Sequence, residues 1–244
     1  MKKYIILIAI FLIPFVANAI TADKLLKEID NKQFYQSIVY KSVMNITFEG
    51  EKLQKKMNVY LRDTISAYIE VSYPPEEKGT RYLKLEDEMW IYLPAADDVI
   101  RISGHMLKQS MLGSDMSYED ASSNDRLSEI YDAEFDTTNH DNNMYVLNLT
   151  ANVKKTSYYR RKLYIDKSSK LILKMDLIAK SGKLLKTMKF DDYKIYGGIY
   201  IPGYMLIEDK IRGNSSTEMY LNDIKIGQQI PGRMFTKAYL RRKS

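Results

Sequence analysis

The sequence predicts a mainly β protein whose antiparallel sheet curls into a barrel or half-barrel. Apolar and polar residues alternate with a period of two in segments such as Lys55–Arg62 and Ser66–Ser72, so each segment has one buried face. Short polar links such as Ser181-Gly182 suit hairpins rather than helical crossovers. About ten strands fit between Ser37 and Ile226, and a strongly twisted sheet of roughly that size tends to curl.

Residues 1–19 predict a cleavable signal peptide. Lys2 and Lys3 give a positive start, Ile5–Val16 forms an apolar run, and Ala17-Asn18-Ala19 is a small-x-small cleavage site. The run is shorter than the roughly 20 apolar residues of a membrane-spanning helix. We therefore expect cleavage after Ala19 and a mature protein that is soluble in the periplasm.

Residues 20–244 are expected to form a single domain, because no shift in composition and no repeat of fixed period divides them. A helix is predicted over Thr21–Phe34, where Thr21 or Asp23 can cap the start and Leu25, Leu26 and Ile29 form an apolar stripe. The chain has no cysteine, so it has neither a disulfide nor a site for an N-terminal lipid anchor. The formal net charge of +6 is spread along the chain without a basic block, which disfavours nucleic-acid binding.

No catalytic set is evident. The chain has two histidines and no cysteine, and it lacks a Gly-x-Ser-x-Gly turn and a phosphate-binding glycine loop. The region His105–Ile130 is predicted as loop with short helices, and Asp115, Glu119 and Asp120 are its densest carboxylates. We expect them to be solvated loop acids, with a glycosidase pair or a cation site as the alternative. The sequence thus predicts no catalytic residue, no metal and no cofactor.

Two further segments carry apolar residues in unusual places. Met89–Leu93 is apolar on both faces of a predicted strand, which implies that a helix or a ligand covers the second face. Pro94 should end that strand, and Arg101–Gly104 should begin the next turn. The basic segment Phe235–Ser244 is expected either to pack on the sheet edge or to serve in binding.

Four motifs follow one another in the first half of the chain: Lys78–Arg81, Trp90–Pro94, Arg101–Gly104 and Gly113–Asp120. With these motifs the chain resembles the family of periplasmic proteins named for outer-membrane lipoprotein sorting, which is related in fold to the lipoprotein carrier LolA. The resemblance implies an open antiparallel β half-barrel with lid-like helices and loops across its mouth. It also implies an apolar concave face that receives acyl chains.

The function implied by this resemblance is a non-enzymatic periplasmic carrier of lipidated proteins or lipids toward the outer membrane. Its expected partners are an inner-membrane release complex and an outer-membrane acceptor, with transient membrane contact and no nucleic acid. The 105–130 region would act as a lid, and the flexible methionines would adapt to variable tails. The alternative is a cell-envelope protein-interaction module without lipid cargo. Apolar and methionine candidates for lipid contact, with two arginines for a polar head group, are Leu83, Leu85, Trp90, Tyr92, Met106, Met111, Met116, Arg81 and Arg101.

Overall fold

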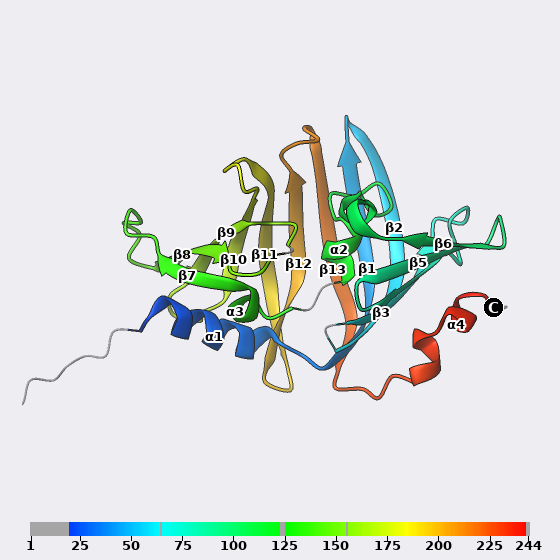
Figure 1. The fold of residues 1–244 in the computed structure, drawn as a ribbon, viewed down its shortest axis with the longest axis horizontal. Helices are drawn as coiled ribbons and strands as arrows, with labels where there is room; N and C mark the ends of the chain where they lie inside the picture. Colours follow the sequence, from blue (N-terminus) through cyan, green and yellow to red (C-terminus); the bar gives the residue numbers. More distant parts are fainter. Residues whose placement is uncertain (1–19, 64, 123–124, 155, 243–244) are drawn as a thin grey trace, which may run out of the picture.

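The computed structural model describes residues 20–63, 65–122, 125–154 and 156–242, so the predicted signal peptide lies outside the described residues. One sheet of 13 strands runs through these residues in the order β6-β5-β4-β3-β2-β1-β13-β12-β11-β10-β9-β8-β7 (Figure 1). Strands that are consecutive in sequence pair with each other, except β6 and β7, and β1 also pairs with the last strand, β13. The first and last strands therefore meet in the middle of the sheet, and β6 and β7 form its edges.

The helices are α1 (Ala22–Gln33), η1 (Gly104–Lys108), α2 (Tyr118–Ser122), α3 (Leu127–Ile130), η2 (Gly232–Phe235) and α4 (Lys237–Leu240). The strands are β1 (Ser37–Phe48), β2 (Glu51–Arg62), β3 (Ser66–Tyr73), β4 (Arg81–Leu85), β5 (Glu88–Leu93), β6 (Asp98–Ile102), β7 (Tyr131–Phe135), β8 (Met144–Ala151), β9 (Arg160–Asp166), β10 (Ile172–Ile178), β11 (Leu184–Tyr196), β12 (Ile199–Asp209) and β13 (Ser215–Ile226).

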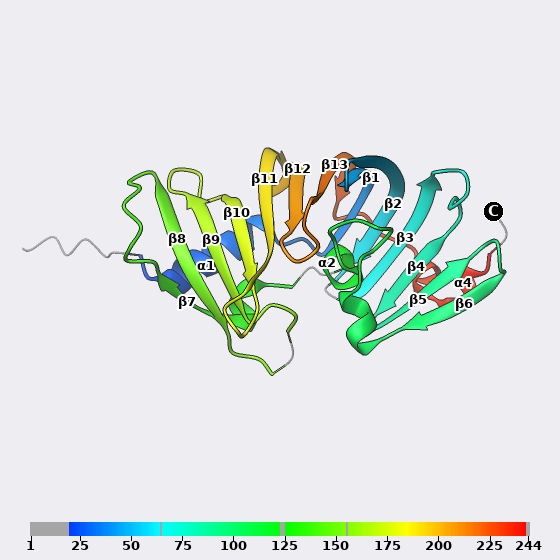
Figure 2. The same cartoon turned by 90° about the horizontal axis from the view of Figure 1, so that it is seen from above.

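The sheet curves into an open arch, as Figure 2 shows from above, and α2 lies within the arch. We call the face toward α2 the inner face and the opposite one the outer face. The predicted half-barrel is confirmed, and the strand count is 13 rather than about ten. The edge strands β6 and β7 have five residues each, too few to show a clear alternation. The turn expected at Arg101–Gly104 begins later, because Arg101 and Ile102 still belong to β6.

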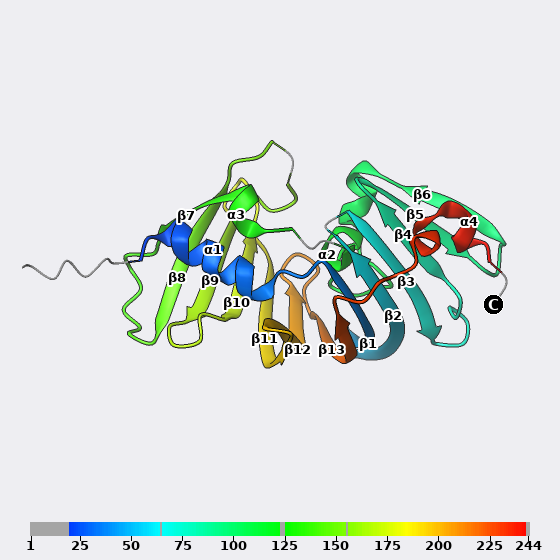
Figure 3. The ribbon, with the colours of Figure 1, turned by 90° about the horizontal axis from the view of Figure 1, so that it is seen from below.

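Helix α1 closes the β7–β10 half of the arch (Figure 3). The Thr21 hydroxyl accepts a hydrogen bond from the Lys24 amide at 3.3 Å, so of the two candidate caps it is Thr21 that caps the helix. Leu25, Leu26 and Ile29 are at most 1% exposed and pack against the inner face of β7–β10. Among the described helices, none is both long and apolar enough to cross a membrane.

The predicted 105–130 loop region divides into two parts. Residues 104–122, which we call the lid segment, pack on the inner face of the β1–β5 half together with β12 and β13. Helix α3 instead packs on α1, where the Asp30 carboxylate accepts hydrogen bonds from the Leu127 and Ser128 amides at 3.1 and 2.8 Å. The region predicted as one loop therefore contacts both halves of the arch, the lid segment on one half and α3 on the other.

Residues 230–242, which we call the C-terminal segment, cover the outer face of β3–β5 (Figure 3). Phe235 and Leu240 are buried against Leu83 and Trp90 of that face. This contact explains why Met89–Leu93 is apolar on both faces: Met89 and Ile91 face inward, and Trp90 lies under the C-terminal segment. Of the two expectations for the chain end, packing on the sheet is the one observed.

Candidate functional site

The inner face holds a cavity of about 300 Å³ where the two halves of the arch meet. Its volume is at the lower end of the roughly 300–1,000 Å³ typical of small-molecule sites. Both halves contribute to its walls, because β1, β2, β12 and β13 supply one side and β9, β10 and β11 the other. The main apolar lining residues are Ile38, Leu61, Met116, Ile172, Met175, Leu177, Met188, Phe190, Ile201, Met205, Met219 and Leu221.

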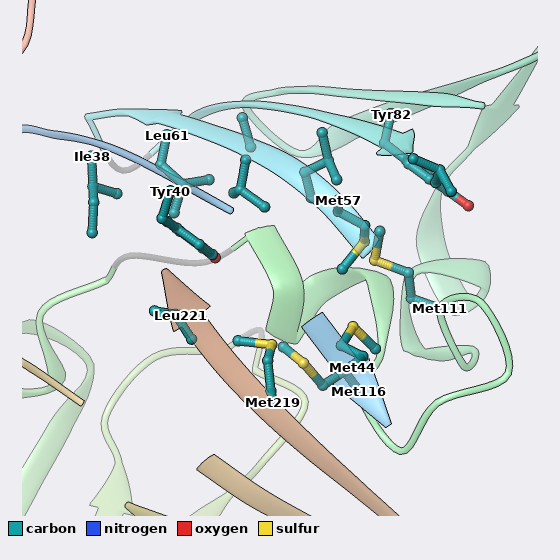
Figure 4. Close-up of a cluster of buried hydrophobic side chains, with 14 of the residues drawn as sticks. Ile38, Tyr40, Met44, Met57, Leu61, Tyr82, Met111, Met116, Met219 and Leu221 are labelled. Atoms are coloured by element: carbon teal, nitrogen blue, oxygen red, sulfur yellow. The ribbon is translucent and has the colours of Figure 1, made fainter. Parts of the chain in front are cut away.

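Methionines form the wall between the cavity and the lid segment (Figure 4). Met111 and Met116 come from the lid segment, and Met44, Met57 and Met219 come from β1, β2 and β13. The same five side chains line a second hollow of about 10 Å³ next to the cavity. Each methionine has three rotatable side-chain bonds, so this wall can repack around an inserted group and join the two spaces.

Polar contacts hold the lid segment to the central strands. The Asp115 side chain is buried, and it accepts a hydrogen bond from the Thr217 hydroxyl of β13 at 2.7 Å. The Asp115 amide in turn donates to the Thr217 hydroxyl at 2.9 Å. Arg212, in the β12–β13 hairpin, donates to the Gly113 carbonyl oxygen at 2.7 Å. The motif Gly113–Asp120 is therefore the part of the lid segment that attaches it to the sheet.

Asp120 links the lid segment to the other half of the arch. Its carboxylate accepts hydrogen bonds from the Lys186 ammonium of β11 at 2.7 Å and from the Tyr158 hydroxyl at 2.9 Å. Burial raises the pKa of Asp120, but the Lys186 ammonium and the Ser117 hydrogen bonds outweigh burial, so the pKa lies below its ordinary 3.8. Burial and the Asp120 carboxylate raise the pKa of Tyr158 far above its ordinary value. Near neutral pH the contact is thus a charged pair with a neutral phenol.

These contacts correct the expectation of solvated loop acids. Asp115 is 2% exposed, and the side chain of Asp120 is 12% exposed. Glu119 accepts a hydrogen bond from Ser157. The acids therefore fasten the lid segment instead of facing water. Within the ranges that the structure describes, no group of three or more His, Asp or Glu side chains could hold a metal ion.

Three of the nine predicted lipid-contact residues lie on the inner face. Met116 lines the cavity and the small hollow, Met111 lines the small hollow, and Met106 packs against the same core. The structure thus brings the predicted methionines together beside the cavity. Their contact with a ligand stays a prediction.

The other six predicted residues lie on the outer face and do not line the cavity. Arg81 is 2% exposed, because it pairs with Glu70 at 3.0 Å and donates to the carbonyl oxygens of Leu240 and Arg242 at 2.8 and 2.6 Å. Arg101 lies opposite Trp90 on that face and pairs with Glu88. The apolar members pack under or beside the C-terminal segment: Leu83, Leu85, Trp90 and Tyr92. Both faces of β4 and β5 are apolar, so alternation alone did not distinguish inner from outer residues.

Arg161 is a cavity residue that sequence reasoning missed. It lies on β9 and shares the inner face with Leu163 and Ile165, which are fully buried. The sequence did carry a signal for it, since Arg161 occupies a position where the alternation of β9 calls for an apolar residue. Lys186 gives the same signal on β11, where it shares a face with Met188 and Phe190.

Comparisons with known proteins agree with this architecture. A family model described as "Uncharacterized protein" matches residues 63–242. A DUF1329 family protein from Desulfovibrio piger has a TM-score of 0.80 and 26% identity over 89% of this chain and 97% of its own. An outer membrane lipoprotein-sorting protein domain from Vibrio parahaemolyticus has a TM-score of 0.79 and 23% identity, covering 91% of this chain and 98% of its own.

A LolA superfamily protein from Nitrosomonas europaea has a TM-score of 0.76 and 22% identity, covering 91% of this chain and 100% of its own. No curated protein sequence matches this chain. The structural likenesses confirm the predicted resemblance to the lipoprotein-sorting proteins and their LolA-like open half-barrel at the level of the fold.

Proposed function

Since the chain belongs to the family whose model matches residues 63–242, and its fold is that of the LolA superfamily, we propose that it is a non-enzymatic carrier of acyl chains. The cargo is a lipidated protein or a lipid, and its acyl chain occupies the inner-face cavity. The observation that carries the proposal is the cavity itself, which is mainly apolar, spans both halves of the arch and ends at a wall of methionines.

The energetics suit reversible binding. Burying about six methylene groups contributes roughly 5 kcal/mol at about 0.8 kcal/mol per methylene. Association and ordering cost about 4–15 kcal/mol, so a short enclosed stretch binds weakly and a longer one binds well. Repacking of Met116 and Met219 would lengthen the enclosed stretch by joining the small hollow to the cavity. Affinity should therefore increase with chain length up to the space that the methionines release.

The lid segment supplies the route in and out. It is attached by methionine packing, a few hydrogen bonds and one ion pair, and we propose that these contacts break without unfolding of the sheet. When Asp120 separates from Lys186, the lid segment loses its link to β11, and the methionine wall can part from the cavity. Lid opening would thus set the rate of loading and release.

We propose that the carrier works in the periplasm after cleavage behind Ala19, and the signal peptide predicted over residues 1–19 supports this. A soluble carrier there would receive cargo at the inner membrane and deliver it toward the outer membrane. The proposed partners are a release complex on one side and an acceptor on the other, each in transient contact with the membrane.

Organic extraction followed by mass spectrometry of the protein purified from its own cells tests the proposal. We expect an acyl lipid or a lipidated protein at near-stoichiometric yield. A variant with Met116 and Met219 changed to Trp fills the cavity and serves as the control, which should lose the lipid while keeping the circular dichroism of the sheet. A clean extract from the native protein would contradict the carrier and favour a protein-interaction module.

A further inference from the structure

Arg161 brings a positive charge to the wall of a mainly apolar cavity. Its Nε donates to the Tyr131 hydroxyl at 2.9 Å, and one terminal nitrogen lies 3.5 Å from the Met175 sulfur, a weak acceptor. The guanidinium also lies over the rings of Tyr131 and Tyr158, at 5.0 and 5.6 Å from their centroids. A guanidinium has five N–H donors, so these contacts use only part of its capacity.

The acidic groups of the cavity are each engaged elsewhere. Asp30 accepts the α3 amides, Asp120 pairs with Lys186, and Asp125 interacts with the partly buried Lys84. Among the residues that the structure describes, no carboxylate lies within 4.0 Å of the Arg161 guanidinium nitrogens. Arg126, the other arginine of the lining, differs because it has Asn31 and Glu129 as partners.

Arg161 is half-buried, and partial removal of a cation from water costs free energy that an anion seated beside it offsets. A guanidinium fork also matches the geometry of a carboxylate or phosphate, to which it can donate two parallel hydrogen bonds. The ring faces of Tyr131 and Tyr158 flank the fork and limit its orientation. The site is thus shaped for one small anionic group of oxygens.

We propose that Arg161 is the head-group site of the cavity and that the preferred ligand is a single acyl chain ending in an anion. This inference rests on the carrier function proposed above and narrows its cargo. The carboxylate or phosphate binds Arg161, and the chain extends along the cavity toward Met116 and Met219 at the lid wall. A fatty acid and a lysophospholipid share this chemistry.

Displacement of a fluorescent acyl probe from the delipidated full-length protein measures the preference. Palmitate is compared with methyl palmitate, which has the same chain without the charge. We expect palmitate to bind at least about tenfold more tightly, because a hydrogen bond to a charged group contributes roughly that factor. A second pair compares lysophosphatidylglycerol, which carries a phosphate, with the neutral monopalmitoylglycerol, and so measures the preference for a phosphate. The pair with the larger ratio of charged-ligand to neutral-ligand affinity shows whether the preferred anion is a carboxylate or a phosphate.

Arg161→Gln should abolish the preference for the anion while leaving methyl palmitate binding within about twofold, since a neutral ligand gains little from the charge. Arg161→Lys keeps the charge without the fork and should retain part of the preference. Arg126→Gln is the matched control and should keep the full preference. Circular dichroism and thermal unfolding of each variant confirm that it is folded.

Three outcomes would overturn the inference. Equal binding of palmitate and methyl palmitate to the native protein removes the head-group site but leaves the carrier function standing. A preference that survives in Arg161→Gln, or that is lost equally in Arg126→Gln, removes the assignment to Arg161. Failure of every acyl ligand to displace the probe overturns the carrier proposal itself.

Discussion

The two halves of the arch are closed in different ways. Over β7–β10, α1 is held by leucine and isoleucine side chains that are at most 1% exposed, so closure there is continuous with the core. Over the β1–β5 half, the lid segment is held by methionines and by the hydrogen bonds of Asp115 and Asp120. Both closures include buried apolar side chains, but the lid segment adds polar contacts between short elements, and contacts of that kind can open locally. This difference favours the lid segment over α1 as the part that we propose to move.

The largest expected effect is on the α1 side. Leu26→Ala removes a side chain that is 0% exposed and should cost about 2–5 kcal/mol of global stability, because the rigid surroundings leave a cavity. Met116→Ala should cost nearer to 2 than to 5 kcal/mol, because the lid segment can settle into the space. Denaturant unfolding measures both. Equal losses would show that the lid segment is as firmly integrated as α1.

Removing the Lys186 cation from the ion pair between the lid segment and β11 should loosen only the lid segment. Lys186→Met leaves the Asp120 carboxylate mostly buried without its partner, which costs about 3 kcal/mol for a buried pair. We expect faster hydrogen exchange in residues 111–122 and unchanged exchange in β8 and β9. Adding Asp120→Asn removes the unpaired charge and should restore part of the protection. Loss of protection throughout the sheet would mean that the lid segment does not open on its own.

Acid should weaken the same link. The pKa of Asp120 in the folded protein lies below its ordinary 3.8, so its contribution to stability is present above pH 3.8 and is lost as the pH falls through the lowered value. The methyl NMR signal of Met116 should then broaden while α1 keeps its protection. In Asp120→Asn this pH dependence should be absent. An unchanged Met116 signal in the native protein at low pH would contradict the role of Asp120.

The smallest effect is expected on the outer face. Arg101 and Glu88 form an exposed pair with side chains 58% and 39% exposed, which is worth about 0–1 kcal/mol. Arg101→Ala should therefore leave both stability and acyl binding nearly unchanged. Weaker acyl binding by this variant would show that Arg101 contributes to ligand binding and would contradict a binding site confined to the inner face.

Much of the architecture could be predicted because alternation and capping are local signals. The period of two along β2 and β3 predicts their inner and outer faces, and Thr21 marks the start of α1. The edge strands were harder to predict, since five residues offer too little periodicity. Strand pairing between β1 and β13 joins residues far apart in sequence, and no local pattern encodes it.

The site was predicted only in part, because local patterns do not reveal what lies across a cavity. The methionines at 106, 111 and 116 gather in one segment of the chain, which drew attention to them, and the structure places that segment beside the cavity. For Trp90 and Arg81 no local pattern indicated the outer face, because the C-terminal segment that covers them is distant in sequence. Arg161 stood out only as a charge in an apolar register, and its significance depends on the cavity that other strands form around it.

Methyl NMR of the methionines during titration with palmitate asks directly whether an acyl chain enters the inner-face cavity. We predict large shifts and acyl contacts at Met116, Met188 and Met219, which line the cavity, and none at Met234, which is buried on the outer face. Shifts confined to surface methionines, or no shift at saturating palmitate, would contradict an acyl-binding cavity on the inner face.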